Sequence, residues 1–202
     1  MSSSKKLLKL WTKWQKINSK LLNKPRKGLL KGNYMENIFL IGMMGCGKTT
    51  VANELSKLLT NYKFVDIDME IEKSTQKKIS EIFLRHGEPF FRMLETEKIK
   101  IFSKKDKQII SVGGGAFEDE QNRNLMLNSG KVVYLKASAL EIFNRIKNET
   151  HRPLLRKDFS VEKIETIMKK RIKNYEKADI IVTTDYKKPE DVAEEILGVI
   201  NG

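Results

Sequence analysis

The feature that most constrains this chain is a glycine-rich segment at residues 42–49, which reads Gly-Met-Met-Gly-Cys-Gly-Lys-Thr. It matches the pattern GxxxxGK[ST] and lies between a short apolar run (37–41) and a stretch that predicts a helix over 48–59. In this context the backbone N–H groups turn inward around phosphate oxygens, and the helix N-terminus adds its positive dipole end. The segment therefore predicts a phosphate-binding loop; a glycine-rich turn without a ligand is the alternative.

The loop also supplies candidate nucleotide ligands. The Lys48 ammonium would reach the β- and γ-phosphates, and the Thr49 hydroxyl would bind Mg²⁺. We interpret Cys46 as a small spacer within the loop; a redox role for its thiol is the alternative. The predicted ATP-binding residues of this segment are Gly45, Cys46, Gly47, Lys48, Thr49 and Thr50.

From Met35 onward, strand-like and helix-like segments alternate along the chain. Five strands alternating with helices predict an α/β fold with a parallel sheet. The expected strands are 37–41, 64–68, 108–112, 132–135 and 179–182, and the expected helices are 48–59, 79–85, 89–104, 119–128, 139–147, 161–177 and 189–200.

Charge is distributed unevenly over the 202 residues. The formal net charge is +13, of which residues 1–34 carry +10, with nine lysines, one arginine and no acidic side chain. The remaining residues carry 29 basic and 26 acidic side chains, so a nucleic-acid partner is not expected. The single cysteine, Cys46, excludes an internal disulfide and favours a reducing compartment. No apolar run is long enough to predict a membrane-spanning helix.

Residues 1–34 form the first of two predicted parts of the chain, and residues 35–202 the second. Apolar residues that include Trp11 and Trp14 recur at helical spacing between lysines, which predicts a basic amphipathic helix. Pro25, Gly28 and Gly32 then break the pattern, which predicts a linker over residues 23–34. Three interpretations stay open: a helix that contacts a membrane surface or a protein, a targeting peptide, or an upstream extension dispensable for a domain starting at Met35. A secretory signal is not expected.

Two carboxylates are candidates for chemistry at the acceptor. Asp66 and Asp68 lie two residues apart in the predicted strand 64–68, so both side chains would face one side of its carboxyl end. One carboxylate could hold Mg²⁺ and the other could accept the proton of a substrate hydroxyl. A pair of solvated turn aspartates is the alternative.

Further candidates follow in the chain. Arg92 and Glu95 share a helix face, and an arginine fork oriented by a glutamate suits an anionic substrate; a surface ion pair is the alternative. The glycines 113–115 follow a strand, which suits close approach to a ligand, although a flexible turn is possible. The polar stretch 150–156 could close over the nucleotide, with Arg152 neutralising charge on the transferring phosphoryl group.

The segments GMMGCGKTT, VDID, FFRMLE, GGGA and RPLL, in this order, resemble those of the shikimate kinase family from Glu36 to about Ile200. The resemblance implies a P-loop NTPase fold of the nucleoside-monophosphate-kinase type, a five-stranded parallel sheet flanked by helices, with a mobile lid at about 149–160. It implies phosphorylation of the 3-hydroxyl of shikimate with ATP and Mg²⁺, in aromatic amino-acid biosynthesis. A cytoplasmic monomer is expected.

The resemblance also implies roles for single residues. Asp68 matches the family's candidate base and substrate ligand, and Asp66, with Thr49, the metal site. Lys48 and Arg152 complete the expected catalytic group, and Arg145 and Arg152 the nucleotide site. The expected substrate-binding residues are Asp68, Arg92, Gly114, Gly115, Arg171, Phe83, Phe91 and, from its spacing to Arg92, Glu95. The loop 185–189 matches the family only loosely.

Two other functions compete with this interpretation. Another small-molecule P-loop kinase, such as a gluconate or nucleotide kinase, would use the same phosphate loop. An NTPase that binds a membrane or nucleic acid through residues 1–34 is the second alternative, and the near-neutral remainder of the chain argues against it. A catalytically inactive relative is disfavoured because Lys48, Thr49, Asp68, Arg92 and Arg152 are all present.

Overall fold

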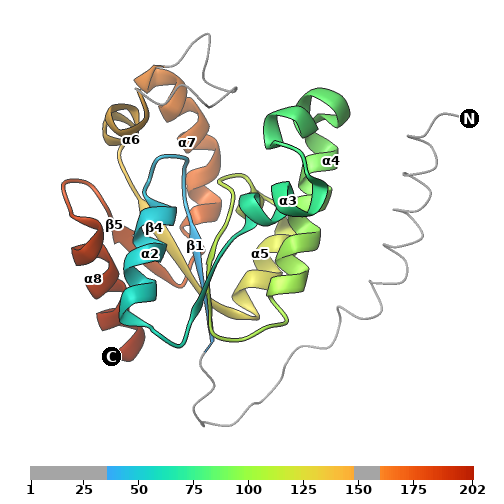
Figure 1. Cartoon of the computed structure of the whole chain (residues 1–202). Coiled ribbons are helices and arrows are strands. Elements are labelled where there is room, and N and C mark those ends of the chain that lie inside the picture. The colour runs from blue at the N-terminus through green and yellow to red at the C-terminus, as the bar shows by residue number, and fades with distance from the viewer. Residues whose placement is uncertain (1–35, 148–159) are drawn as a thin grey trace, which may run out of the picture. The chain divides into compact units, whose positions relative to one another are not determined.

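A computed structural model of the chain describes residues 36–147 and 160–202 (Figure 1). Its described residues contain one sheet of five parallel strands in the order β2-β3-β1-β4-β5, which confirms the predicted sheet. The amphipathic segment 1–34 and nearly all of the predicted lid at 149–160, including Arg152, lie outside the described residues. The strands are β1 Asn37–Ile41, β2 Lys63–Asp66, β3 Gln108–Ser111, β4 Gly130–Lys136 and β5 Ile180–Thr183.

Helices cover both faces of the sheet (Figure 1). Helices α2 and α8 pack together on one face, and α4 and α5 pack together on the other. Within residues 36–147 and 160–202, no helix is long and apolar enough to cross a membrane. The helices are α2 Lys48–Leu58, α3 Ile67–Thr75, α4 Ile79–Phe102, η1 Ala116–Glu118, α5 Glu120–Leu127, α6 Ala139–Ile146, α7 Val161–Tyr175 and α8 Pro189–Asn201.

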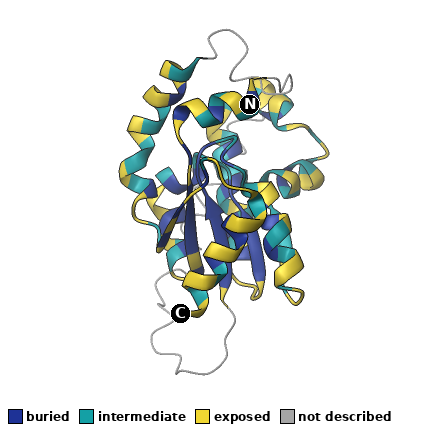
Figure 2. Cartoon of the chain, turned by 90° about the vertical axis from the view of Figure 1, so that its left-hand side faces the viewer, coloured by how far each residue is buried: buried dark blue, intermediate teal, exposed yellow. Residues whose placement is uncertain are grey.

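The central strands form the core (Figure 2). Every residue of β1 and of β3 is buried, because helices cover both sides of these strands. The strand register sets the position of the loops at the carboxyl edge. Ser111 lies opposite Leu40 on one side and Asp66 on the other, so the segments that follow β1, β2 and β3 leave the sheet next to one another.

One predicted strand is wrong at its end. The strand expected over 64–68 stops at Asp66, and residues 67–75 form α3, which the sequence interpretation missed. Asp66 has extended backbone angles and its side chain accepts a hydrogen bond from Met69 N, as an N-cap does. An aspartate before an acidic first turn is a helix-start signal, so the sequence did contain this information.

The two helices expected over 79–85 and 89–104 are found as two helical segments of α4. Gly87 divides them with a positive φ of 77° and a ψ of 170°, and Pro89 lies in the first turn of the second segment. The other predicted elements are found with their ends shifted by a few residues. The bend at Gly87 separates the segment that carries Phe83 from the one that carries Phe91, Arg92 and Glu95.

Candidate active site

The phosphate loop lies between β1 and the first turn of α2. Gly42 has a φ of 141°, and a Cβ atom there would stand 2.7 Å from the carbonyl oxygen of Leu135 on β4. At Gly45, where φ is 76°, a Cβ atom would stand 2.6 Å from Ile146 Cγ2 on α6. Both positions therefore require glycine for conformation and for close packing against neighbouring elements.

Lys48 points into the curve of this loop. Its Nζ donates hydrogen bonds to the carbonyl oxygens of Gly42 and Met43, each at 3.0 Å. The ammonium group is thus held among the loop's own backbone oxygens, next to the place where the N–H groups of a P-loop bind phosphate. The Cys46 side chain is buried, as expected for a spacer, and its Sγ lies 3.9 Å from Lys48 Nζ.

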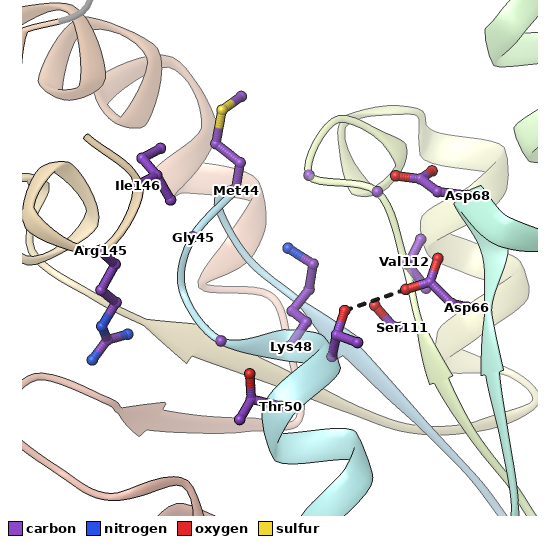
Figure 3. Close-up of a pocket in the computed structure, with 14 residues that line it drawn as sticks. Met44, Gly45, Lys48, Thr50, Asp66, Asp68, Ser111, Val112, Arg145 and Ile146 are labelled. Atoms are coloured by element: carbon purple, nitrogen blue, oxygen red, sulfur yellow. Dashed lines mark hydrogen bonds between the residues drawn. The ribbon is translucent and has the colours of Figure 1, made fainter. Parts of the chain in front are cut away.

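A cavity of about 460 Å³ opens at the carboxyl edge of the sheet beside this loop (Figure 3). Lys48 and Arg145 lie on its phosphate-loop side, and Asp66 and Asp68 lie on the side of β2 and α3. Residues from both sides of the predicted site therefore line one space. The lining residues are Met44, Gly45, Gly47, Lys48, Thr49, Thr50, Asp66, Asp68, Ser111, Val112, Gly113, Gly114, Arg145 and Ile146.

Two oxygen groups in this cavity fit a magnesium ion. The Thr49 hydroxyl on α2 donates to Asp66 Oδ2 at 3.3 Å (Figure 3), and Asp66 Oδ1 caps α3. Mg²⁺ prefers oxygen ligands and keeps several waters beside one or two protein groups and substrate phosphates. A hydroxyl and a carboxylate placed together beside a phosphate loop match this preference.

Asp68 reaches the cavity from a helix and not from a strand. It stands in the first turn of α3, so the expectation that Asp66 and Asp68 share one side of a strand is wrong. Both nevertheless line the cavity, because the chain turns into α3 directly after Asp66. A Cβ atom at Gly113 would stand 3.3 Å from Asp68 Oδ1, which places this carboxylate against the glycine loop.

Three consecutive glycines bring the other acceptor candidates together. Gly113 faces the Glu95 carboxylate so closely that a Cβ atom would collide with it. A Cβ atom at Gly114 would lie 3.4 Å from Arg171 Nη1 on α7, and one at Gly115 would lie 2.6 Å from Arg92 Nη2 on α4. Side chains from α3, α4 and α7 therefore converge on this loop.

The Arg92–Glu95 pair is buried at its acidic end. Arg92 Nη1 donates to Glu95 Oε2 at 2.8 Å, while Nε and Nη2 donate to Glu88 Oε1 at 3.1 and 2.9 Å. The Glu95 side chain is fully buried, so this is not the surface ion pair that the sequence left open. Burial, helped by the nearby Asp68 carboxylate, raises the Glu95 pKa to about 7, although Arg92 and Arg171 oppose the shift.

Two aromatic rings lie beside this pair. The Phe83 and Phe91 rings have centroids 4.8 Å apart, and the Arg92 guanidinium lies 5.2 Å from the Phe91 centroid. The rings come from the two segments of α4, and the bend at Gly87 lets them meet. They form an apolar boundary next to the arginine.

Arg145 lies beside the phosphate loop. Its guanidinium donates to the Cys46 carbonyl oxygen at 3.3 Å, to Thr184 Oγ1 at 3.1 Å and to the Thr184 carbonyl oxygen at 2.7 Å. Its Nε pairs with Glu141 Oε1 at 2.9 Å. The flat guanidinium is thereby fixed between the phosphate loop and the loop after β5.

Sequence reasoning missed several residues of the site. Ser111 lines the cavity at the end of β3, and the rule that ligands bind at the carboxyl ends of parallel strands could have found it. Tyr175 donates a hydrogen bond to the Gly114 carbonyl oxygen. It follows Arg171 by one helical turn, so the i,i+4 spacing was the available signal. Glu88 stands four residues before Arg92, so the same spacing was available for it. Thr184 left no such signal.

A phosphate loop between a strand and a helix, beside a glycine loop on which two arginines and a carboxylate converge, defines a P-loop kinase. Comparison with known proteins narrows this class. Residues 44–201 match the family described as shikimate kinase. The chain is 44% identical over 163 residues to the shikimate kinase of Thermodesulfovibrio yellowstonii, covering 81% of this chain and 94% of that protein. The chain belongs to the shikimate kinase family, and it is therefore a kinase with ATP as its co-substrate.

Other relatives and solved structures agree. The shikimate kinase of Persephonella marina is 42% identical over 82% of this chain and 99% of its own length. The structure of the Acinetobacter baumannii shikimate kinase in complex with shikimate aligns with a TM-score of 0.79 and 34% identity, covering 83% of this chain and 93% of that one. The Mycobacterium tuberculosis APS kinase aligns with a TM-score of 0.55 and 11% identity over 85% of this chain and 100% of its own, a likeness of fold alone.

Proposed function

We propose that this protein transfers the γ-phosphoryl group of ATP to the 3-hydroxyl of shikimate, giving shikimate 3-phosphate and ADP. The observation that carries the proposal is the convergence of Arg92, Arg171 and Asp68 on the glycines 113–115 beside the phosphate loop. Two guanidinium groups suit a carboxylate, and a carboxylate next to them suits a hydroxyl. Shikimate presents both groups on one small ring.

On the nucleotide side, the loop amides and Lys48 would bind the phosphates, with Thr50 and Arg145 lining the same space. Thr49 and Asp66 would hold Mg²⁺, which when bound neutralises phosphate charge. The resemblance adds Arg152 as a further positive charge toward the transferring group. Lys48 would leave the loop carbonyl oxygens to meet the phosphate oxygens that replace them.

On the acceptor side, Arg92 and Arg171 would fix the carboxylate of the substrate, with Glu95 holding Arg92 in place. Phe83 and Phe91 would limit the pocket, and Gly114 and Gly115 would let the substrate approach the backbone. Asp68 would orient the 3-hydroxyl and take its proton. The hydroxyl oxygen forms a bond to the γ-phosphorus as the bond from that phosphorus to the bridging oxygen breaks, and ADP leaves.

A different acceptor, such as gluconate or a nucleotide, is the first competing function. The two arginines beside Asp68 and the 37–44% identity to several shikimate kinases favour shikimate. The second competing function, binding of a membrane or nucleic acid through residues 1–34, concerns a segment outside the described residues. We keep a weak membrane or protein contact of this segment as a secondary proposal.

ADP release with a panel of hydroxylated acids and nucleoside monophosphates tests the proposal. We expect release that depends on shikimate, both for the full chain and for a version that starts at Met35. Equal release with gluconate or a nucleotide would contradict the acceptor assignment. Release lost in the shorter version would contradict the proposed division into a dispensable segment 1–34 and a kinase domain 35–202.

Two further properties belong to the proposal and follow from the family resemblance. We propose that the enzyme is a monomer, because one chain supplies the phosphate loop, Asp68 and both arginines. We also propose a cytoplasmic location, where ATP is available. Light scattering and cell fractionation would test these two statements.

A further inference from the structure

Tyr175 ends helix α7 and is buried, with 1% of its surface exposed. Its hydroxyl donates a hydrogen bond to the carbonyl oxygen of Gly114 and lies 3.9 Å from Met43 Sδ. Its ring packs on Tyr134 of β4, with centroids 4.9 Å apart. One side chain of α7 therefore contacts the glycine loop, the phosphate loop and the sheet.

Arg171 lies one helical turn before Tyr175, on the same face of α7. Its Nη1 lies 3.6 Å from Met43 Sδ, the same sulfur that Tyr175 approaches. It also lies 3.4 Å from where a Cβ atom of Gly114 would stand. The guanidinium and the phenol thus meet the same two neighbours, so the anchoring of Tyr175 sets where Arg171 is held.

The phenol is suited to act as a fixed donor. Burial raises the pKa of Tyr175 above its ordinary value, although Arg171 opposes the shift. The hydroxyl therefore keeps its proton over the working pH range and can always donate to the Gly114 carbonyl oxygen. Because this bond fixes the loop as well as the helix, it holds both the arginine and the glycine that would contact the acceptor.

We propose that Tyr175 is a positioning residue for acceptor binding, which fixes Arg171 and Gly114 relative to each other. Met43 is the second residue that holds Arg171 in place. The proposal rests on the proposed function, since it assigns the acceptor carboxylate to Arg171. Tyr175 acts through these neighbours and has no chemical role of its own. Met43 belongs to the phosphate loop, so the acceptor arginine is supported partly by the donor loop.

The substitution Tyr175→Phe removes the hydroxyl and keeps the ring. We expect the KM for shikimate to rise about tenfold, as the loss of one buried hydrogen bond allows, while the KM for ATP changes by less than about twofold. Tyr134→Phe is the matched control, because it removes the hydroxyl of the other buried ring of the same pair. We expect it to leave both KM values within about twofold.

A double-mutant cycle with Arg171→Lys separates positioning from general weakening of the fold. If Tyr175 acts through Arg171, Tyr175→Phe has a smaller effect on the KM for shikimate in the Arg171→Lys background than in the wild type. Met43→Leu, which removes the sulfur and keeps the apolar bulk, should raise the same KM about twofold to threefold.

The proposal would be overturned if the two substitutions of the cycle had additive effects on the KM for shikimate. It would also be overturned if Tyr175→Phe and Tyr134→Phe had equal KM values for shikimate. A parallel rise in both KM values of Tyr175→Phe would also overturn it, since that pattern indicates general loosening. A wild-type enzyme without shikimate-dependent turnover would instead overturn the proposed function, and this role of Tyr175 with it.

Discussion

The two halves of the proposed active site, one for the nucleotide donor and one for the acceptor, are built in different ways. The donor half is almost entirely one contiguous segment, residues 42–50, with Arg145 and Asp66 added from elsewhere. The acceptor half takes Asp68 from α3, Arg92 from α4, the glycines 113–115 from the loop after β3 and Arg171 from α7. One half is a local motif, and the other exists only where four distant parts of the chain meet.

The difference shows what the sheet contributes to function. The phosphate loop needs only a strand, a turn and a helix in sequence. The acceptor half needs the register that sets Asp66 opposite Ser111 and Ser111 opposite Leu40, because this register brings the three loops to one edge. A change in the donor half should therefore act locally, except at Met43, which contacts Arg171. A change in the acceptor half should act through its neighbours.

The largest expected effect is in the donor half. Lys48→Ala removes the ammonium that would stabilise the transferring phosphoryl group, so we expect kcat to fall about 10³-fold. Steady-state ADP release measures it. Lys57→Ala, at the exposed end of the same helix, is the control and should keep wild-type turnover. A Lys48→Ala enzyme with more than a tenth of wild-type kcat would contradict the assignment.

Asp68→Asn tests the reacting group of the acceptor half. The amide can still orient a hydroxyl but cannot take its proton, so we expect kcat to fall about 10²-fold while ATP affinity stays nearly unchanged. Turnover assays and nucleotide titration measure the two quantities. Glu70→Gln removes another carboxylate from the first turn of α3 and should have little effect. Near-normal turnover of Asp68→Asn would refute the proposed base.

Glu95 gives the acceptor half a pH-dependent stability. Its folded pKa of about 7 lies above the ordinary 4.5, so the folded state binds the proton more tightly than the unfolded state. The contribution of this bound proton to the free energy of unfolding is complete below about pH 4.5 and is lost as the pH rises through about 7. Glu95→Gln should remove this pH dependence. The free energy of unfolding of the variant should therefore rise, relative to that of the wild type, by up to about 3 kcal/mol between these pH values.

Denaturant unfolding at several pH values measures this difference in the free energy of unfolding. Glu88→Gln is the matched control, because it removes the exposed carboxylate bound to the same Arg92. An exposed ion pair contributes less than about 1 kcal/mol, so its variant should show the wild-type pH profile. If the free energies of unfolding of Glu95→Gln and the wild type differ by the same amount from pH 4 to 8, the raised pKa of the Glu95 carboxyl is excluded.

The smallest expected effect concerns the fork of Arg92. Arg92→Lys keeps a positive charge but loses the planar pair of donors, so we expect the KM for shikimate to rise about tenfold with the KM for ATP unchanged. Arg85→Lys makes the same change at an exposed arginine of α4 and should leave both values unchanged. An unchanged KM for shikimate in Arg92→Lys would remove this residue from the acceptor half.

Much of the fold was predictable because its signals are local. The phosphate loop, the five strands and the division of α4 at Gly87 each follow from residues close together in the sequence. The strand predicted over 64–68 failed at Asp66, where a capping side chain starts a helix. Both aspartates still line the same cavity, so this error in secondary structure did not separate them.

The sequence by itself determined the class of chemistry, because GxxxxGK[ST] between a strand and a helix folds through contacts among neighbouring residues. It also carried the candidate arginines and carboxylates, and the family resemblance ordered them. Only the tertiary structure decided that Glu95 is buried against Arg92 and that Tyr175 joins α7 to Gly114. Burial and contact between distant residues depend on how the helices pack on the sheet, which no local pattern specifies.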